Sequence, residues 1–144
     1  MDATSPGRSP AAAPLDATFR KDCPGRPLFE QATSRWGLLI LLALAPGALR
    51  FAQLRDRIGG ISEKMLTQNL RTLVRDGLLD RTVETETPLR VSYSLTAIGH
   101  DLSGRLRGLI DWSEEHGEEI SAARTRHDAR TPQPTPTGKR ATTA

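Results

Sequence analysis

The spacing of apolar residues changes twice along the middle of this 144-residue chain, and this change most limits the folds open to it. Apolar residues recur every three or four positions over 51–74, largely every second position over 79–95, and every three or four positions again over 98–109. A period near 3.6 indicates amphipathic helices, whereas a period of two indicates strands with one buried face. The order predicts a mainly α fold with a small β-hairpin.

The first helical stretch, 51–74, predicts two short helices that meet at a tight turn. The apolar positions of the first are Phe51, Leu54 and Ile58, and those of the second are Met65, Leu66, Leu70, Leu73 and Val74. Gly59 and Gly60 favour a turn between the two helices. Ser62 is a preferred N-cap residue for the second helix, and Gly77 is a preferred residue just past its end.

The second helix carries polar, mostly basic side chains opposite its apolar stripe. Spacings of three, four and seven residues return to the same side of an α-helix. This polar face consists of Lys64, Thr67, Gln68, Arg71 and Arg75. Helix, glycine turn, helix and hairpin in this order describe a winged helix-turn-helix, in which the second helix enters the major groove of DNA. We therefore predict a DNA-reading helix here.

The residue types on this face suit the edges of base pairs. Arg71 can form two hydrogen bonds with guanine, and Gln68 can do the same with adenine. Ser62 and Thr67 can hold a phosphate near the helix N-terminus, where unpaired amides favour anions. Lys64 completes the predicted DNA-binding face.

Two further arginines are predicted contacts to the DNA backbone. Glu84 and Glu86 make the tip of the hairpin unfavourable for phosphate, so the wing contact is expected at Arg90 on the second strand. Arg50 lies at the start of the first short helix and is the second candidate.

The polar face has two other interpretations. Charged residues commonly cover solvated helix surfaces, and a winged helix can bind another protein instead of DNA. The formal charge of +3, from 20 Lys and Arg against 17 Asp and Glu, permits a polyanionic partner without demanding one. Acids gather near the hairpin whereas bases recur on the predicted face, and this arrangement favours DNA.

Helices on both sides complete a predicted domain over 20–120. A short helix is expected over 28–33 and an apolar one over 35–45, followed after the hairpin by a last helix that Thr96 can cap. Core candidates on the apolar helix are Leu38, Leu39, Leu41, Leu42 and Leu44. The segments 1–19 and 121–144 are rich in Pro, Ala and Thr and are predicted to be disordered, because they cannot bury enough apolar area to offset the entropy of ordering.

Four ordered motifs resemble those of a known family. They are LRFAQL at 49–54, GISEKMLTQNL at 60–70, LVRDGLLDR at 73–81 and VSYSLTAIG at 91–99. Through them, residues 23–115 resemble the HxlR-type winged-helix regulators of bacteria. The resemblance implies a homodimeric transcription factor, here expected to be a repressor, that binds an inverted-repeat operator in double-stranded DNA. It places the reading helix on Ser62, Lys64, Thr67, Gln68 and Arg71 and the wing contact on Arg90.

The single cysteine, Cys23, matches an early Cys-Pro pair of that family. Some members sense oxidants or electrophiles at this cysteine, so the resemblance implies a redox input. Arg20, Lys21 and Arg26 lie nearby in sequence, and positive charge favours the thiolate. An inert thiol is the alternative interpretation. A small-molecule effector is another, with no ligand indicated.

The family pairs its subunits through terminal helices. The corresponding predicted dimer interface comprises Leu28, Phe29, Leu102, Leu106 and Leu109. Two winged helix-turn-helix domains related by a twofold axis would contact two half-sites about one turn of DNA apart. The last helix can instead close the core of its own subunit, and the two roles are compatible.

Other classes of protein are disfavoured. The three histidines are scattered, and no nucleophile, paired carboxylates or metal-ligand spacing falls on one element, so we expect neither an enzyme nor a metal or other cofactor. The longest apolar run, 36–46, is about half of a bilayer span, so no membrane association is expected. A cytoplasmic protein associated with the nucleoid is the resulting expectation.

Overall fold

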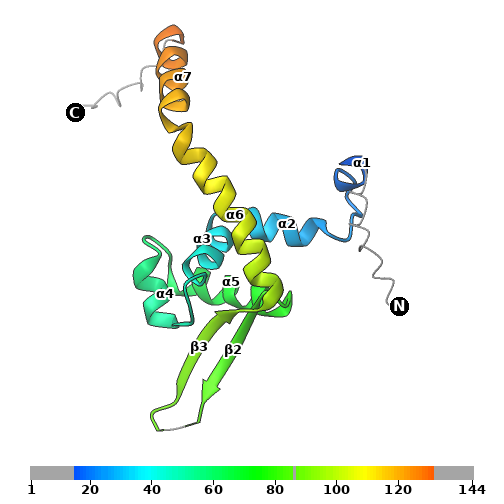
Figure 1. The fold of residues 1–144 in the computed structure, drawn as a ribbon, viewed down its shortest axis with the longest axis vertical. Coiled ribbons are helices and arrows are strands. Elements are labelled where there is room, and N and C mark those ends of the chain that lie inside the picture. The colour runs from blue at the N-terminus through cyan, green and yellow to red at the C-terminus, as the bar shows by residue number, and fades with distance from the viewer. Residues whose placement is uncertain (1–14, 86, 132–144) are drawn as a thin grey trace, which may run out of the picture. The chain divides into compact units, whose positions relative to one another are not determined.

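The computed structural model describes residues 15–85 and 87–131, and this part of the chain contains seven helices and three strands (Figure 1). The helices are α1 (Leu15–Thr18), α2 (Arg26–Thr33), α3 (Arg35–Ala43), α4 (Phe51–Arg57), α5 (Glu63–Arg75), α6 (Ala97–Glu115) and α7 (Gly117–Arg130). The strands are β1 (Leu49–Arg50), β2 (Leu79–Glu84) and β3 (Arg90–Leu95). The predicted order of helices, hairpin and a last helix is confirmed, whereas α7, which follows that helix, was not predicted. The chain divides into two compact units, Met1–Leu106 and Arg107–Ala144.

Glycines with positive φ mark both ends of the α5 region. Gly60, at φ 84°, makes the turn between α4 and α5. Gly77, at φ 75°, follows α5, and there the amides of Gly77 and Leu78 bond the carbonyls of Val74 and Leu73 at 3.0 Å each. This pattern satisfies carbonyls that the end of a helix leaves unpaired, and the left-handed backbone suits glycine. The turn residues that the sequence indicated therefore set both limits of α5.

The sheet has three antiparallel strands in the order β1-β3-β2, whereas the sequence predicted only the two strands of the hairpin. Strand β1 has two residues, with Leu49 opposite Tyr93 and Arg50 opposite Ser92, which is too short for an alternating pattern to be visible. Strands β2 and β3 extend beyond the helices as the wing (Figure 1). At their inner ends Leu79 and Leu95 lie opposite each other, and both are buried.

The core of the first unit is aliphatic. Its fully buried large side chains are Ile40, Leu41, Leu44, Leu54, Leu66, Leu70, Leu73 and Leu79. Among the core candidates of the apolar helix α3, Leu41 and Leu44 are confirmed as buried, and Leu38 and Leu42 pack against the core. The prediction that Leu39 is buried is wrong, because 37% of its surface is exposed. An apolar helix still has one side turned from the domain centre, so being apolar all round does not bury every leucine.

Helix α6 begins with a close approach to the chain just after α5. A Cβ atom at Gly99 would lie 2.2 Å from the carbonyl oxygen of Leu78, so only glycine fits. Thr96, predicted to cap this helix, accepts a 3.1 Å hydrogen bond from the amide of Gly99 and donates one of 2.7 Å to the carbonyl of Gly77. Further along, Ser103 donates to the carbonyl of Leu41 at 3.2 Å, which joins α6 to α3.

The second unit contains the end of α6 and all of α7. In α6, Arg107 donates to Asp111 at 2.9 Å, and this hydrogen bond and charge raise the pKa of the guanidinium. Near the junction with α7, the rings of Trp112 and His116 stack with centroids 4.6 Å apart. Helix α7 has acidic residues in its first turn and basic ones in its last, which suits the helix dipole.

Both predicted disordered segments need correction where the structure describes them. The segment 121–144 was expected to lack structure, yet α7 continues to Arg130, because Ala, Glu and Arg favour a helix even when no side chain on it is buried. The short α1 lies within the expected segment 1–19. The remaining residues of these segments, 1–14 and 132–144, are outside the described residues.

Candidate nucleic-acid interface

Helix α5 is held in the domain by one face. Leu66, Leu70 and Leu73 are buried in the core. The predicted N-cap is present, since the hydroxyl of Ser62 accepts a 3.1 Å hydrogen bond from the amide of Met65. Met65, expected in the apolar stripe, is 37% exposed at the margin of the buried face. The inner face and both ends of α5 are thus fixed, and its outer face is left to solvent.

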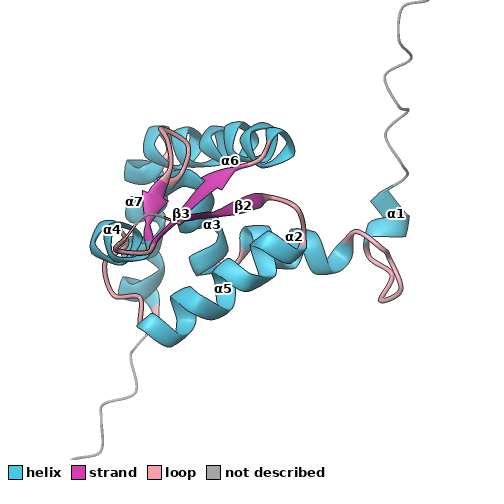
Figure 2. Ribbon diagram, turned by 90° about the horizontal axis from the view of Figure 1, so that it is seen from below, coloured by secondary structure: helices cyan, strands magenta, loops and turns pink. Residues whose placement is uncertain are grey.

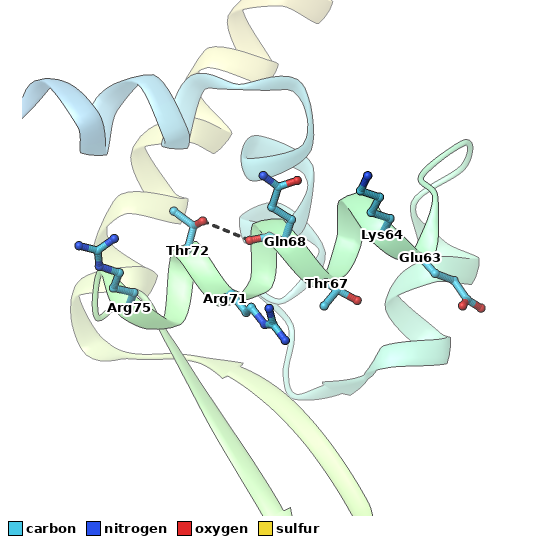
Figure 3. A pocket seen from close by; sticks show the side chains of 7 residues that line it. All are labelled: Glu63, Lys64, Thr67, Gln68, Arg71, Thr72 and Arg75. Atoms are coloured by element: carbon cyan, nitrogen blue, oxygen red, sulfur yellow. Dashed lines mark hydrogen bonds between the residues drawn. The ribbon is translucent and has the colours of Figure 1, made fainter.

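The outer face of α5 carries all the residues predicted for base contacts. Lys64, Thr67, Gln68 and Arg71 are exposed, and Lys64 and Gln68 project from one side of α5 while Arg71 projects nearer the wing strands (Figure 3). These four side chains, with Glu63, Thr72 and Arg75, line an open hollow of about 670 Å³. The structure therefore brings the predicted reading residues together on one accessible surface.

This surface is more basic than its composition suggests. Glu63 is the single acid among the residues lining the hollow, and its carboxylate accepts a hydrogen bond from Arg55 of α4. None of Lys64, Arg71 and Arg75 is in an ion pair with another described residue. Three cations thus face solvent while the one carboxylate is paired, an arrangement that favours an anionic ligand.

The wing and the start of α4 hold the two predicted backbone contacts. Arg90 is exposed at the outer end of β3, where the register places Glu84 directly opposite it. Arg50 is exposed in β1 and precedes α4, and its amide donates to the side chain of Gln53 at 2.9 Å. Glu86, expected at the wing tip, is outside the described residues.

A second hollow lies between α5 and the wing. This helix–wing groove has a volume of about 530 Å³ and is lined by Thr67, Leu70, Arg71, Val74, Arg75, Arg81 and Tyr93. Arg81 was not predicted as a site residue. It occupies the register position between Leu79 and Val83, on the face of β2 that begins in the core, and a charged residue at such a position was the signal that could have identified it.

Cys23 lies half-buried in the turn before α2. Its carbonyl accepts a 3.1 Å hydrogen bond from the amide of Arg26. The cations expected to favour its thiolate are largely engaged elsewhere, since Arg20 pairs with Asp22 at 3.2 Å and Arg26 with Glu30 at 2.9 Å. The local positive charge is smaller than the sequence suggests.

The residues of the predicted dimer interface fall into two groups by their exposure. Leu28, Phe29 and Leu109 are 41%, 42% and 50% exposed. Leu106 is 7% exposed within the core of its own unit, and Leu102 packs against that core. The first group is available to a partner, whereas the second already has an intramolecular role.

Over 15–85 and 87–131, no three His, Cys, Asp or Glu side chains gather as metal ligands would. None of the described helices combines the length and apolar character that crossing a bilayer requires.

Comparison with known proteins agrees with this geometry. The model of the family described as HxlR-like helix-turn-helix matches residues 32–121. The uncharacterized HTH-type transcriptional regulator YtfH of Escherichia coli K12 is 46% identical over 106 residues, which are 74% of this chain and 84% of that protein. The solved structure of the putative transcriptional regulator ytfH from Salmonella typhimurium has a TM-score of 0.70 and 44% identity, covering 74% of this chain and 96% of that one.

A third relative is a redox regulator, HypR, solved in its reduced form. Its TM-score is 0.64 and its identity 27%, covering 69% of this chain and 98% of that one. The family match, the relatives and the winged helix-turn-helix geometry agree, and this chain belongs to the HxlR-like helix-turn-helix family of transcriptional regulators.

Proposed function

We propose that this regulator binds an inverted-repeat operator as a homodimer and represses the genes that the operator controls. Helix α5 enters the major groove, where Lys64, Gln68 and Arg71 contact base edges. Ser62 and Thr67 lie beside a phosphate, and Arg50 and Arg90 contact the backbone on either side. The observation that carries this proposal is the exposed polar face of α5, directly opposite the buried leucines that fix the helix.

The homodimer is supported by apolar surface on the helices that flank the DNA-binding elements. Leu28 and Phe29 on α2 and Leu109 on α6 are exposed large hydrophobic side chains, which cost free energy in water unless a partner covers them. A second copy of the chain also supplies the second reading helix that an inverted repeat requires.

We also propose Cys23 as the position of a redox input. The similarity to a redox regulator supports it, as does the partial exposure of Cys23. With one cysteine in the sequence, oxidation would join two subunits or one subunit and a small thiol. In either case two thiols lose two protons and two electrons to an oxidant such as diamide, and one S–S bond forms.

Selection of binding sites from random duplexes tests the DNA-binding proposal. The purified protein should enrich an inverted repeat, and its affinity should fall steeply with salt. Arg71→Ala should abolish the enrichment, while the matched control Arg105→Ala on α6 should retain it. Failure to enrich any sequence, with binding insensitive to both salt and Arg71→Ala, would favour a winged helix that binds proteins.

Diamide treatment tests the redox input on the same duplex. Operator affinity of the wild-type protein should change on oxidation and recover with dithiothreitol, whereas that of Cys23→Ser should not change. An equal response of the two proteins would remove Cys23 as the switch and leave a small-molecule effector as the next candidate.

A further inference from the structure

The helix–wing groove gathers three arginines, of which only Arg71 is a predicted DNA contact. Arg71 and Arg75 of α5 line it together with Arg81 of β2. None of the three forms an ion pair with any residue of 15–85 or 87–131. Three arginines line this one hollow, and an anion among them would reduce the repulsion between their like charges. The groove therefore favours an anionic occupant.

The position of Arg81 also supports an anionic occupant of the groove. Its cross-strand partner is Tyr93, and both lie on the sheet face that starts with the buried pair Leu79 and Leu95. Continued burial would favour apolar residues at both positions. Instead the face changes to a guanidinium and a phenol where it leaves the core, and both can donate hydrogen bonds to an oxyanion. Thr67 offers a further hydroxyl from the helix side.

Duplex geometry identifies the occupant. When a reading helix lies in the major groove and a wing reaches the adjoining minor groove, the sugar-phosphate strand that separates the two grooves has to pass between helix and wing. In this protein that space is the helix–wing groove, which is lined by residues of α5 on one side and of β2 and β3 on the other. Figure 2 shows the ribbons of α5 and of these two strands side by side. Arginine binds phosphate in paired hydrogen bonds, and three arginines line this groove.

We propose that the helix–wing groove is a backbone phosphate site, in which Arg75 and Arg81 hold the DNA strand between the major groove read by α5 and the minor groove reached by the wing. Arg71 shares the groove and can contact both this phosphate and a base edge. The inference rests on the proposed DNA binding and adds two contacts to it. Because these contacts go to a phosphate, they set register and affinity and carry no base preference.

Salt dependence of binding gives the first test. On the selected operator and on a scrambled duplex, Arg81→Gln should weaken binding by the same factor, about tenfold, as loss of a charge-assisted bond predicts. The slope of log Kd against log salt should fall by about 0.9 for one lost phosphate contact. Arg75→Gln should act likewise, Arg81→Lys should keep the slope, and the control Arg105→Gln should match the wild type. Thermal melts confirm that each variant is folded.

Neutral phosphates give the second test. In a set of operator duplexes, one phosphate at a time is replaced by an uncharged methylphosphonate. At one position in each half-site, this should weaken wild-type binding by about tenfold and Arg81→Gln binding by less than about twofold, because the variant has already lost that contact. Equal sensitivity of the two proteins at every position, or an unchanged salt slope in Arg81→Gln, would overturn the inference while leaving DNA binding intact.

A free phosphate ion has the same chemistry as the backbone, so a third measurement separates them. Inorganic phosphate replaces chloride at constant ionic strength. An unchanged Kd shows that no free anion holds the groove against DNA. Binding of inorganic phosphate to the DNA-free wild type but not to Arg81→Gln, together with equal DNA affinity of the two proteins, would assign the groove to a free anion instead. Absence of salt-dependent binding by the wild type would reject the DNA-binding proposal itself.

Discussion

Gln31 of α2 donates a 2.8 Å hydrogen bond from Nε2 to Oδ1 of Asn69 on α5. Asn69 is 8% exposed and donates from Nδ2 to the carbonyl of Met65, also at 2.8 Å. A buried amide satisfied in this way fixes the relative position of two helices more strictly than apolar contact does, because hydrogen bonds are directional. The reading helix is therefore attached by a polar bond on its inner side to the helix that follows Cys23.

Removing one partner of this pair should cost more than removing both. Gln31→Leu leaves Oδ1 of Asn69 buried without a donor, and we expect a loss of about 1–3 kcal/mol in the free energy of unfolding. The double variant Gln31→Leu/Asn69→Leu should recover part of that loss, because neither side chain then needs a partner. Urea unfolding of the four proteins gives the coupling energy. Additive effects would mean that the bond contributes nothing specific.

Two glycines of α6 should respond oppositely to alanine. At Gly99 a Cβ would lie 2.2 Å from a backbone carbonyl, so Gly99→Ala should destabilise the fold by roughly 1–3 kcal/mol through overpacking. At Gly104 a Cβ meets nothing within 4 Å, so Gly104→Ala should stabilise it by about 0.5–1 kcal/mol through helix propensity. Denaturant midpoints at matched protein concentration check both. Equal shifts for the two variants would contradict the close approach.

The cap of α5 separates stability from DNA binding. Ser62→Ala should lower stability by about 0.5–2 kcal/mol through loss of the bond to the amide of Met65. Ser62→Asp should restore stability, because aspartate caps as well as serine. It should also weaken operator binding, because a carboxylate then stands where we place a phosphate. Unchanged affinity in Ser62→Asp would move the phosphate away from this terminus.

Reading and wing contacts should differ in their effect on sequence preference. Gln68→Ala should reduce discrimination at one base position by about 1–3 kcal/mol. Arg90→Ala should weaken binding to all duplexes by similar factors, because a backbone contact does not distinguish bases. Competition among single-base variants of the selected operator measures both effects. A loss of preference in Arg90→Ala would indicate that the wing reads bases.

Exposed apolar side chains on α2 and α6 should determine the oligomeric state. Leu28→Glu and Leu109→Glu should each shift the protein toward monomer, because a carboxylate at a buried interface is strongly unfavourable. Leu89→Glu is the matched control, since Leu89 is 70% exposed in the wing and belongs to neither helix. Sedimentation velocity over a range of concentrations gives the result. A wild-type monomer throughout that range would contradict the dimer.

Sequence patterns were reliable where one residue type has one physical role. Gly60, Ser62 and Gly77 marked the limits of α5, because few residues adopt a positive φ or cap a helix. The polar face of α5 could be predicted for a similar reason, since a helix held by buried leucines at one face must expose the other. These features are local, and the sequence displays them directly.

Features that depend on distant partners were missed. Strand β1 exists because Leu49 and Arg50 pair with β3, more than forty residues later, and two residues show no periodicity of their own. Leu39 was wrongly predicted to be buried and Arg81 was not predicted as a site residue, because exposure and the outline of a groove arise only after the helices and the sheet pack. The helical part of 121–130 was not predicted, because the Pro- and Thr-rich remainder of the segment hides the helix propensity of its first ten residues.

Strand β1 has a mechanical consequence. Arg50 pairs with Ser92 of the wing and is also the residue from which α4 begins, so one short ladder joins the wing to the first helix of the DNA-binding pair. The wing cannot swing outward without either breaking that ladder or tilting α4. The wing and α4 should therefore leave DNA together, in one concerted step. A signal that breaks the pairing of β1 with β3 would release both elements at once.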